Sequence, residues 1–413
     1  MYYRNFLALA LVAATGLASA NVDLGKRQAS HSEQKAIHNQ GTTDPVAAAK
    51  AVLAIKNIGE QGSLWANDSL VSGDENGKQV PWASNVTFHS LPAAQVDGES
   101  WATVPDSFDS FTLNKTTKIT DRKGVQLTMP FYINSKYTAS NIKRAIIVWP
   151  GMWRDSWRYA AMTNNAYEIA KSMYGVEDGS VLIIAPLFLN EGDKQSGSVA
   201  DDYVFFKDAG WSVGGTTHNE NGTITSFAII DKLIDYVTNT REFPNLEKVV
   251  MVGHSLGAQA NQRYAVLSDR GNKPISYWFG NPGAYTWLSN KRPDSTSGCD
   301  NFDSWPNGIG NADSVSVYGR RRLKKNKDGL VQDFLNRETM IALGLTDNGG
   351  HSSSCEKNVQ GANRLQKGAN FILHLNDVNG GFPEQFKVNF VPRVSHQDYP
   401  MLANLDTVQY IFT

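Results

Sequence analysis

From Gln126 to the end of the chain, short apolar runs alternate with amphipathic segments. Six of the runs are almost continuously apolar, which is typical of parallel strands that are buried on both faces. The alternation predicts an α/β fold in which a mostly parallel sheet is covered by helices on both faces. The predicted strands are Arg144–Trp149, Val181–Pro186, Lys248–Gly253, Ser276–Gly280, Met340–Leu345 and Phe386–Val391. The predicted helices are Trp157–Tyr174, Ser226–Val237, Ala258–Leu267 and Asn363–Leu375.

Two other stretches do not follow this pattern. Residues 21–79 are polar, apart from one short helix that begins at Pro45 and ends before Gly59. We interpret them as a leader or surface segment ahead of a domain at residues 80–413. Residues 282–337 are rich in Gly, Asn, Ser and Pro and contain a basic run from Arg320 to Lys327. We expect a cap inserted over the carboxyl edge of the sheet, with the basic run as a solvated loop.

The first residues have the three parts of a secretory signal peptide. Arg4 precedes an apolar run over residues 6–14, and the small residues Ala18-Ser19-Ala20 follow it. This run is too short for a membrane span, which needs about 20 apolar residues. We therefore expect residues 1–20 to be removed and the protein to be secreted, without stable membrane insertion. The pair Lys26-Arg27 then offers a site for dibasic processing after Arg27.

The cysteines and glycosylation sequons fit the same route. Cys299 and Cys355 are the only two cysteines, and in an oxidising compartment such a pair predicts one disulfide. No C-x-x-C or H-E-x-x-H motif accompanies them, so we predict no metal site and no cofactor. Four sequons predict N-glycosylation, and they begin at Asn67, Asn85, Asn114 and Asn221.

The charge balance argues against polyanionic partners. The chain has 39 basic and 40 acidic side chains, which creates no field that would gather nucleic acid. With 41% hydrophobic residues it has ample material for a packed core. We expect a globular protein that acts on a small molecule.

The pentapeptide Gly253-His254-Ser255-Leu256-Gly257 is the most specific chemical signal. In a strand-turn-helix setting, Gly-x-Ser-x-Gly forms a strained turn that exposes the serine hydroxyl, and small flanking residues let the backbone segments approach closely. The run Lys248–Val252 supplies the strand, and Ala258 and the residues after it supply the helix. The motif therefore predicts that Ser255 is a nucleophile. An ordinary glycine-rich turn is the alternative.

A serine nucleophile needs a general base, which is most often histidine. Three histidines follow Ser255 in the chain, His351, His374 and His396. His374 lies in an amphipathic helix, where a packed or surface role is expected, and His351 lies in a polar loop. His396 follows the last predicted strand, and a loop at that place can reach the serine. We favour His396 as the base.

The base in turn needs a carboxylate that orients its ring. Asp347 follows the strand Met340–Leu345 and is the acid with the best position, although a turn aspartate in Asp347-Asn348-Gly349 is the structural alternative. Three acids of lower weight are Asp313, Asp333 and Asp377.

The negative charge of an acyl-transfer intermediate needs backbone N–H donors, which form an oxyanion hole. One donor should be Leu256, the residue after the nucleophile. The second should come from the loop after Trp149, and we predict Met152, with Gly151 as the alternative.

Taken together, these motifs resemble the α/β-hydrolase superfamily, and more narrowly a group of fungal secreted hydrolases, over residues 144–404. The resemblance implies a Ser255-Asp347-His396 triad and acyl-ester chemistry. Two positions differ from common members, which have His-Gly at Pro150-Gly151 and glycine at Ser395. Besides the pentapeptide, the shared motifs are residues 151–155, 211–215 and 243–246, Gln259 with residues 263–265, residues 279–282, Cys299 with Trp305, Leu343-Gly344 with Asp347, and residues 394–396.

Three functions follow as hypotheses. The first is hydrolysis of a carboxylic ester or lactone, with a small-molecule or lipid-like substrate. The second is acyl transfer or lactone formation in secondary metabolism, which uses the same serine with an alcohol as acceptor. The third is a noncatalytic binding protein on a hydrolase scaffold, which the ordered Ser, Asp and His disfavour.

Overall fold

The computed structural model describes residues 29–55, 100–121, 123–220 and 222–413. The signal peptide, the Lys26-Arg27 site and the sequons at Asn67, Asn85 and Asn221 lie outside these ranges, so they remain predictions. Asn114 lies within them, at the end of a short strand, and its side-chain oxygen accepts a hydrogen bond from Thr117 N–H at 3.1 Å.

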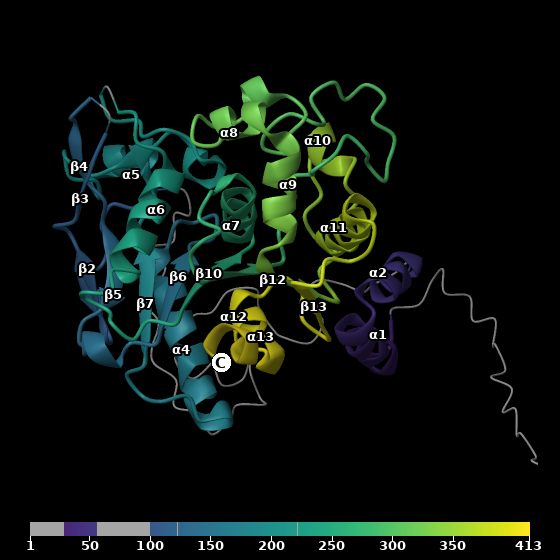
Figure 1. The fold of residues 1–413 in the computed structure, drawn as a ribbon, viewed down its shortest axis with the longest axis horizontal. Helices are drawn as coiled ribbons and strands as arrows, with labels where there is room; N and C mark the ends of the chain where they lie inside the picture. Colours follow the sequence, from purple (N-terminus) through teal and green to yellow (C-terminus); the bar gives the residue numbers. More distant parts are fainter. Residues whose placement is uncertain (1–28, 56–99, 122, 221) are drawn as a thin grey trace, which may run out of the picture.

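A nine-stranded sheet runs through the centre of the molecule (Figure 1). Its strands pair in the order β1-β2-β5-β7-β6-β10-β11-β12-β13. The pairs from β7 to β13 are parallel, and those among β1, β2, β5 and β7 are antiparallel. The strands are β1 (Ser107–Phe108), β2 (Phe111–Asn114), β5 (Phe131–Asn134), β6 (Arg144–Trp149), β7 (Val181–Pro186), β10 (Lys248–His254), β11 (Ile275–Gly280), β12 (Glu338–Gly344) and β13 (Phe386–Val391).

The six predicted strands are therefore confirmed to within one or two residues, and the mostly parallel sheet is confirmed with them. The antiparallel strands were not predicted, because each is only two to four residues long. Two smaller pairs flank the sheet. They are β3 (Lys118–Thr120) with β4 (Gln126–Thr128), and β8 (Leu189–Asn190) with β9 (Phe205–Phe206).

Helices cover both faces of the sheet, as predicted. Alternate side chains of each strand point to opposite faces, so Val249 and Met251 join one buried cluster while Val250 and Val252 join the other. One face carries α4 (Ser156–Tyr174), α12 (Asp398–Leu402) and α13 (Leu405–Phe412). The other carries α6 (Ser226–Val237), α7 (Leu256–Leu267), α9 (Lys327–Leu335) and α11 (Arg364–Asn379).

Two N-terminal helices lie at the edge of the sheet, where the first packs against β13 and the second against α11 (Figure 1, purple). They are α1 (His31–Thr43), which was not predicted, and α2 (Pro45–Ala54), which was. Ser30 and Glu33 form a capping box that begins α1. Ile37 and Val52 are buried in the main core. This part of the expected leader is thus packed into the folded domain.

The stretch between β11 and β12 forms the expected insertion, with two corrections. The basic run is a helix, α8 (Arg320–Lys325), in which Arg322 and Lys324 form ion pairs with acidic side chains. The next helix, α9, packs against α7 and buries Phe334 in the core, so it belongs to the helical layer over the sheet. The inserted cap therefore ends before Lys327.

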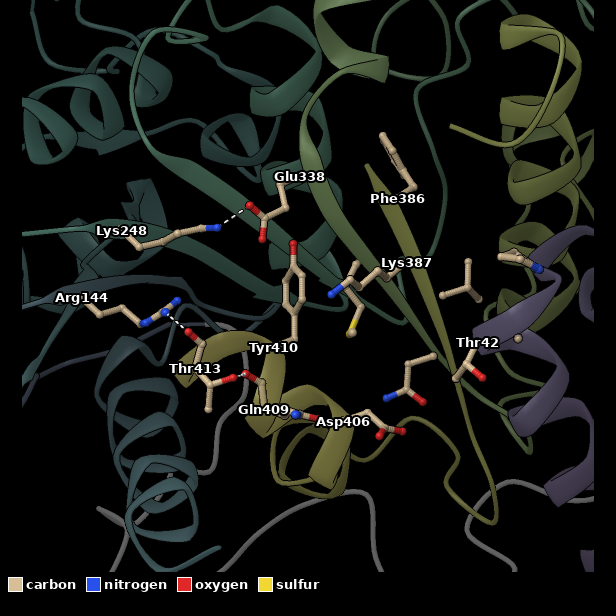
Figure 2. A pocket seen from close by; sticks show the side chains of 15 residues that line it. Thr42, Arg144, Lys248, Glu338, Phe386, Lys387, Asp406, Gln409, Tyr410 and Thr413 are labelled. Carbon is tan, nitrogen blue, oxygen red and sulfur yellow. Dashed lines mark hydrogen bonds and ion pairs between the residues drawn. The ribbon is translucent and has the colours of Figure 1, made fainter. Parts of the chain in front are cut away.

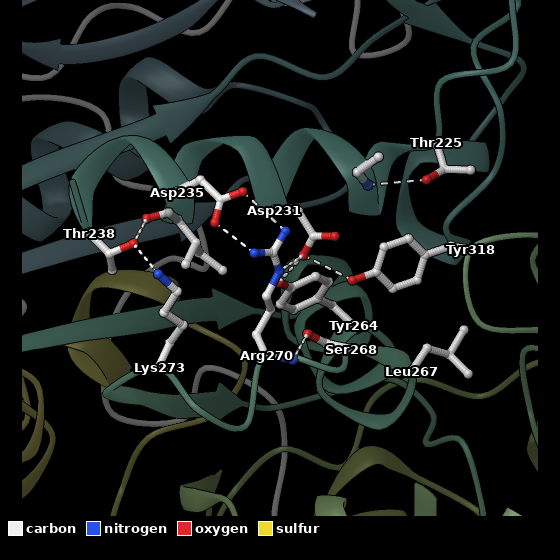
Figure 3. A network of polar contacts seen from close by, with 12 residues as sticks. Thr225, Asp231, Asp235, Thr238, Tyr264, Leu267, Ser268, Arg270, Lys273 and Tyr318 are labelled. Carbon is white, nitrogen blue, oxygen red and sulfur yellow. Dashed lines mark hydrogen bonds and ion pairs between the residues drawn. The ribbon is translucent and has the colours of Figure 1, made fainter. Parts of the chain in front are cut away.

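A polar network ties this insertion to the helices beneath it (Figure 3). The carboxylate of Asp231 in α6 accepts hydrogen bonds from the hydroxyls of Tyr264 at 2.7 Å and Tyr318 at 2.9 Å. Arg270 donates to the same oxygen at 3.2 Å and to Asp235 at 2.6 Å. Since Tyr318 belongs to the insertion, the network fixes the insertion against α6 and α7.

Cys299 and Cys355 form a disulfide, as predicted. Cys299 lies in the insertion, and Cys355 begins α10 (Cys355–Asn358), in the segment after Asp347. The bond therefore links the insertion to that segment. In the part of the chain that the structure describes, no helix is both long and apolar enough to cross a bilayer.

Candidate active site

Ser255 occupies a sharp turn between β10 and α7. Its backbone has φ 56° and ψ −120°, a conformation that costs energy for any residue with a Cβ. Both flanking glycines are needed because the chain folds back on itself. A Cβ on Gly253 would lie 2.4 Å from the carbonyl oxygen of Gly257, and one on Gly257 would lie 2.5 Å from that of Pro150. The turn presents the Ser255 side chain at the carboxyl end of the sheet.

The structure brings the three predicted residues together, although 141 residues separate Ser255 from His396. His396 Nε2 lies 2.9 Å from Ser255 Oγ, and His396 Nδ1 lies 2.8 Å from Asp347 Oδ2. A carboxylate only accepts hydrogen bonds, so Nδ1 carries the proton and donates it to Asp347. In the neutral ring, Nε2 is then free to accept the Ser255 hydroxyl hydrogen.

Asp347 is fully buried behind His396. Arg364, at the start of α11, donates to its other oxygen, Oδ1, at 3.1 Å. Burial alone would raise the pKa of Asp347, but His396 and Arg364 outweigh it and hold this pKa below its usual value. Asp347 is therefore ionised at neutral pH and can stabilise a positive charge on His396.

The loop that carries His396 is tied directly to the strand that leads to Asp347. Asn281, which follows β11, donates to the carbonyl of Ser395 at 2.8 Å and accepts from Gly344 N–H at 2.8 Å. Thr346 N–H donates to the carbonyl of Val394 at 3.0 Å. These bonds set the separation of Asp347 and His396. Asn281 lies within the shared motif at residues 279–282, but the motif alone predicts no role for it.

A second histidine of the pentapeptide lies beside the first. The rings of His254 and His396 have centroids 4.8 Å apart. His254 is buried, and burial, with a smaller contribution from His396, holds its pKa well below the usual value. His254 is therefore neutral and does not repel a protonated His396. The pentapeptide pattern alone predicts no role for His254, because that position of Gly-x-Ser-x-Gly accepts any residue.

The two predicted sources of oxyanion donors also adjoin each other. The loop after β6 passes so close to Gly257 that only glycine fits there, and Gly151 packs against the hydroxyl of Tyr159. Leu256 N–H starts α7, and no described residue accepts a hydrogen bond from it. The same holds for the N–H groups of Gly151 and Met152. Their roles as donors stay predictions.

This loop is held in place by a buried ion pair. Arg154 donates to both carboxylate oxygens of Asp193 at 2.8 and 2.9 Å, and its backbone N–H bonds to the carbonyl of Gly151 at 3.2 Å. The backbone of Arg154 has φ 63°. These contacts fix the turn that presents Gly151 and Met152.

The alternative residues lie elsewhere. His351 is exposed, as is Asp377. Asp313 and Asp333 form ion pairs on the insertion and α9. His374 is a buried residue of α11, and its Nε2 accepts a hydrogen bond from Leu288 N–H at 3.0 Å. The structure therefore brings only His396 and Asp347, among the weighed candidates, to Ser255.

The position of His374 predicts a pH dependence of stability. Burial lowers the pKa of His374 from 6.5 to about 3. Because this folded value lies below the unfolded one, the stabilisation is complete above pH 6.5 and is lost as the pH falls toward 3. From pH 7 to pH 5, this group should lower the free energy of unfolding by about 2 kcal/mol.

Urea unfolding of wild type and His374→Gln at both pH values would measure this loss. Glutamine offers an oxygen to Leu288 N–H and does not titrate, so the variant should lose about 2 kcal/mol less between pH 7 and pH 5. Other groups contribute equally to both proteins. Equal losses in the two proteins would contradict the prediction.

The sheet order, the antiparallel strand β5, the Ser255 turn after β10 and the chain order Ser, Asp, His now identify the architecture. The chain has the α/β-hydrolase fold. No protein-family model matches the chain, and no curated protein matches it in sequence.

Solved structures with related architecture include three hydrolases. A poly(3-hydroxybutyrate) depolymerase from Bordetella parapertussis is 18% identical, covers 72% of this chain and 89% of its own, and has a TM-score of 0.48. Poly(aspartic acid) hydrolase-1 from Sphingomonas sp. KT-1 is 19% identical, covers 73% of this chain and 98% of its own, and has a TM-score of 0.45. The siderophore hydrolase EstB from Aspergillus nidulans is 12% identical, covers 74% of this chain and 93% of its own, and has a TM-score of 0.38. The α/β-hydrolase assignment depends on the sheet topology and the serine turn, and not on these likenesses, whose TM-scores are all below 0.5.

A pocket of about 420 Å³ lies at the amino-terminal edge of the parallel strands, opposite the carboxyl edge that carries Ser255 (Figure 2). Its lining includes Arg144, Lys248 and Glu338, which are the first residues of their strands. β10 has seven residues, and at about 3.3 Å per residue this edge is about 20 Å from Ser255. Lys248 pairs with Glu338, and Arg144 contacts the last residue, Thr413. This pocket is therefore separate from the candidate active site.

Proposed function

We propose that this chain is a secreted serine hydrolase that cleaves carboxylic esters or lactones. The observation that carries the proposal is the continuous hydrogen-bonded chain from Asp347 through His396 to Ser255, at a strained turn of an α/β-hydrolase fold. A structural serine does not need a histidine and a buried carboxylate in this order. A nucleophile does.

In the proposed reaction, Ser255 Oγ attacks the acyl carbon while its proton passes to His396 Nε2. The imidazolium that forms is stabilised by Asp347, which already accepts from Nδ1. His396 then gives the proton to the leaving alcohol, and an acyl-enzyme remains on Ser255. A water molecule then attacks the acyl carbon and gives a proton to His396. His396 returns this proton to Ser255 Oγ as the acid leaves, so the enzyme regains its starting state.

The carbonyl oxygen becomes negatively charged during both attacks. The backbone N–H of Leu256 and one from the Gly151-Met152 loop are proposed to receive it. The close approach of this loop to Gly257 supports these two donors, because both N–H groups are then expected near the Ser255 hydroxyl. Donors fixed by packing need little reorganisation when the charge develops.

The proposed location is extracellular, and the proposed substrate is a small-molecule or lipid-like ester. The N-terminal signal pattern supports secretion, as does the Cys299–Cys355 disulfide, since structural disulfides persist in oxidising compartments. His396 and Ser255 are both partly exposed, which supports access for a substrate from solvent.

The proposal is tested by labelling the secreted wild-type protein with a fluorophosphonate and locating the adduct by mass spectrometry. We expect one adduct, on the peptide that contains Ser255, and turnover of p-nitrophenyl esters that stops when labelling is complete. Absence of both reactions would contradict the proposed function. An adduct on another serine would contradict the assignment of the nucleophile.

The substrate is then narrowed with esters of graded acyl length, with product analysis in the presence and absence of added alcohols. Hydrolysis predicts free acid as the product in both cases. A new ester as the main product would assign acyl transfer to the same serine instead.

A further inference from the structure

The histidine loop depends on a strand at the edge of the sheet. Among the described strands, β13 has one neighbour in the sheet, β12, so the other side of β13 presents backbone groups that no described strand pairs with. The loop from β13 to α12 carries His396, and it passes through Arg393, whose backbone has φ 63° although it is not glycine. A strained turn at a sheet edge holds its shape only if its surroundings fix it.

Helix α1 covers this open side of β13 with two polar side chains. Gln34 Oε1 accepts a hydrogen bond from Arg393 N–H at 2.7 Å. His38 Nδ1 lies 3.0 Å from the carbonyl oxygen of Phe390, so Nδ1 is the donor. Gly41 sits so close to the Phe390 ring that a Cβ would lie 2.9 Å from it. The helix is therefore fitted to the end of β13.

Gln34 is itself held rigidly. It is 3% exposed, and its Nε2 donates to the carbonyl of Ala29 at 3.1 Å. The capping box of Ser30 and Glu33 fixes the first turn of α1 around it, with Ser30 N–H 2.6 Å from the Glu33 carboxylate. A buried amide whose oxygen and NH₂ both form hydrogen bonds holds the segments that it contacts in one geometry.

The rest of the turn is fastened to the core. Val391 and Val394 carbonyls accept from the chain that follows β12, and Asn281 holds the Ser395 carbonyl. On the outer side of the turn, Gln34 accepts the hydrogen bond from the N–H of Arg393, which lies three residues before His396. Inner and outer bonds together determine where the imidazole points.

We propose that α1 is a positioning element for the catalytic base, in which Gln34 fixes the Arg393 turn and so holds His396 within hydrogen-bonding distance of Ser255. This role rests on the proposed hydrolase function. The segment first interpreted as a leader thereby becomes part of the catalytic domain, and dibasic processing after Arg27 would leave α1 intact.

The test compares Gln34→Met with Gln34→Glu. Methionine keeps the length and helix propensity of glutamine but removes both the oxygen that accepts from Arg393 N–H and the NH₂ that donates to the Ala29 carbonyl. Glutamate removes only the NH₂ and keeps the acceptor, so the two variants differ in the bond to Arg393. Gln40→Met, at an exposed position of the same helix, is the matched control. Each protein is assayed well below its Tm, with kcat on a p-nitrophenyl ester normalised to the sites titrated by fluorophosphonate.

We expect Gln34→Met to lower kcat by about tenfold with KM almost unchanged, because a small displacement of a catalytic group slows the chemical step. The rate of fluorophosphonate labelling should fall in parallel. We expect Gln34→Glu to retain most of the activity and Gln40→Met to equal wild type.

Wild-type kcat per titrated site in Gln34→Met would overturn the positioning role while leaving the proposed function intact, even if the Tm were lower. Equal losses in Gln34→Met and Gln34→Glu would also overturn it, because the acceptor would then not matter. A wild-type protein that neither labels nor hydrolyses esters would instead refute the proposed function, and this role with it.

Discussion

Replacement of Ser255 with alanine is expected to lower kcat on p-nitrophenyl esters by about 10⁴-fold or more and to abolish fluorophosphonate labelling. The methyl group of alanine cannot attack an acyl carbon, and His396 has no nucleophile to deprotonate. Steady-state kinetics at saturating substrate, together with labelling of intact protein, measure both effects. Because the proposed oxyanion donors and the surrounding side chains are unchanged, substrate binding should be nearly unaffected.

The folded state should tolerate this substitution. Alanine meets the same backbone cost as serine at φ 56°, and the side chain loses only the bond to His396. The Tm should therefore stay within a few degrees of wild type. Ser297→Ala, at an exposed position of the insertion, is the control and should retain full activity. Substantial turnover by Ser255→Ala would contradict the nucleophile assignment.

The core of the fold was predictable because it depends on local pattern. Strands such as Val181–Pro186 are buried along their full length, so their continuous apolar composition predicts them. The helix α1 was not predictable in this way. It buries only Gln34, Ile37 and Gly41 among the residues whose burial is described, and its partners at the end of β13 and in the turn after it are about 350 residues away in sequence. No local pattern reports such a contact.

The same distinction separates the residues of the site. Ser255 lies in a motif that specifies its own backbone, and Asp347 and His396 each follow a recognisable strand. Asn281 acts through two side-chain hydrogen bonds, to Ser395 and Gly344, which are 114 and 63 positions away, and Arg364 acts through one to Asp347, 17 positions before it. An asparagine after a strand and an arginine at a helix start are common, and only the three-dimensional structure shows what they bind.

Replacement of Asp347 with asparagine is expected to lower kcat by about 10³- to 10⁴-fold. Arg364 explains why an amide cannot substitute. Its Nη1 donates to one oxygen of Asp347 while His396 Nδ1 donates to the other, so both sides need an acceptor. An asparagine offers one oxygen and one NH₂. With its oxygen toward Arg364, it directs the NH₂ at His396 Nδ1, which must then lose its proton, and the ring becomes the tautomer that cannot accept from Ser255.

In an Arg364→Met background, the asparagine introduced by Asp347→Asn is free to turn its oxygen toward His396 and restore the useful tautomer. The loss in kcat caused by Asp347→Asn should therefore be about tenfold smaller there than in the wild-type background. Steady-state kinetics of the two single variants, the double variant and wild type close the cycle, with circular dichroism to verify folding. An equal loss in both backgrounds would show that the missing negative charge, and not the tautomer forced by Arg364, explains the defect.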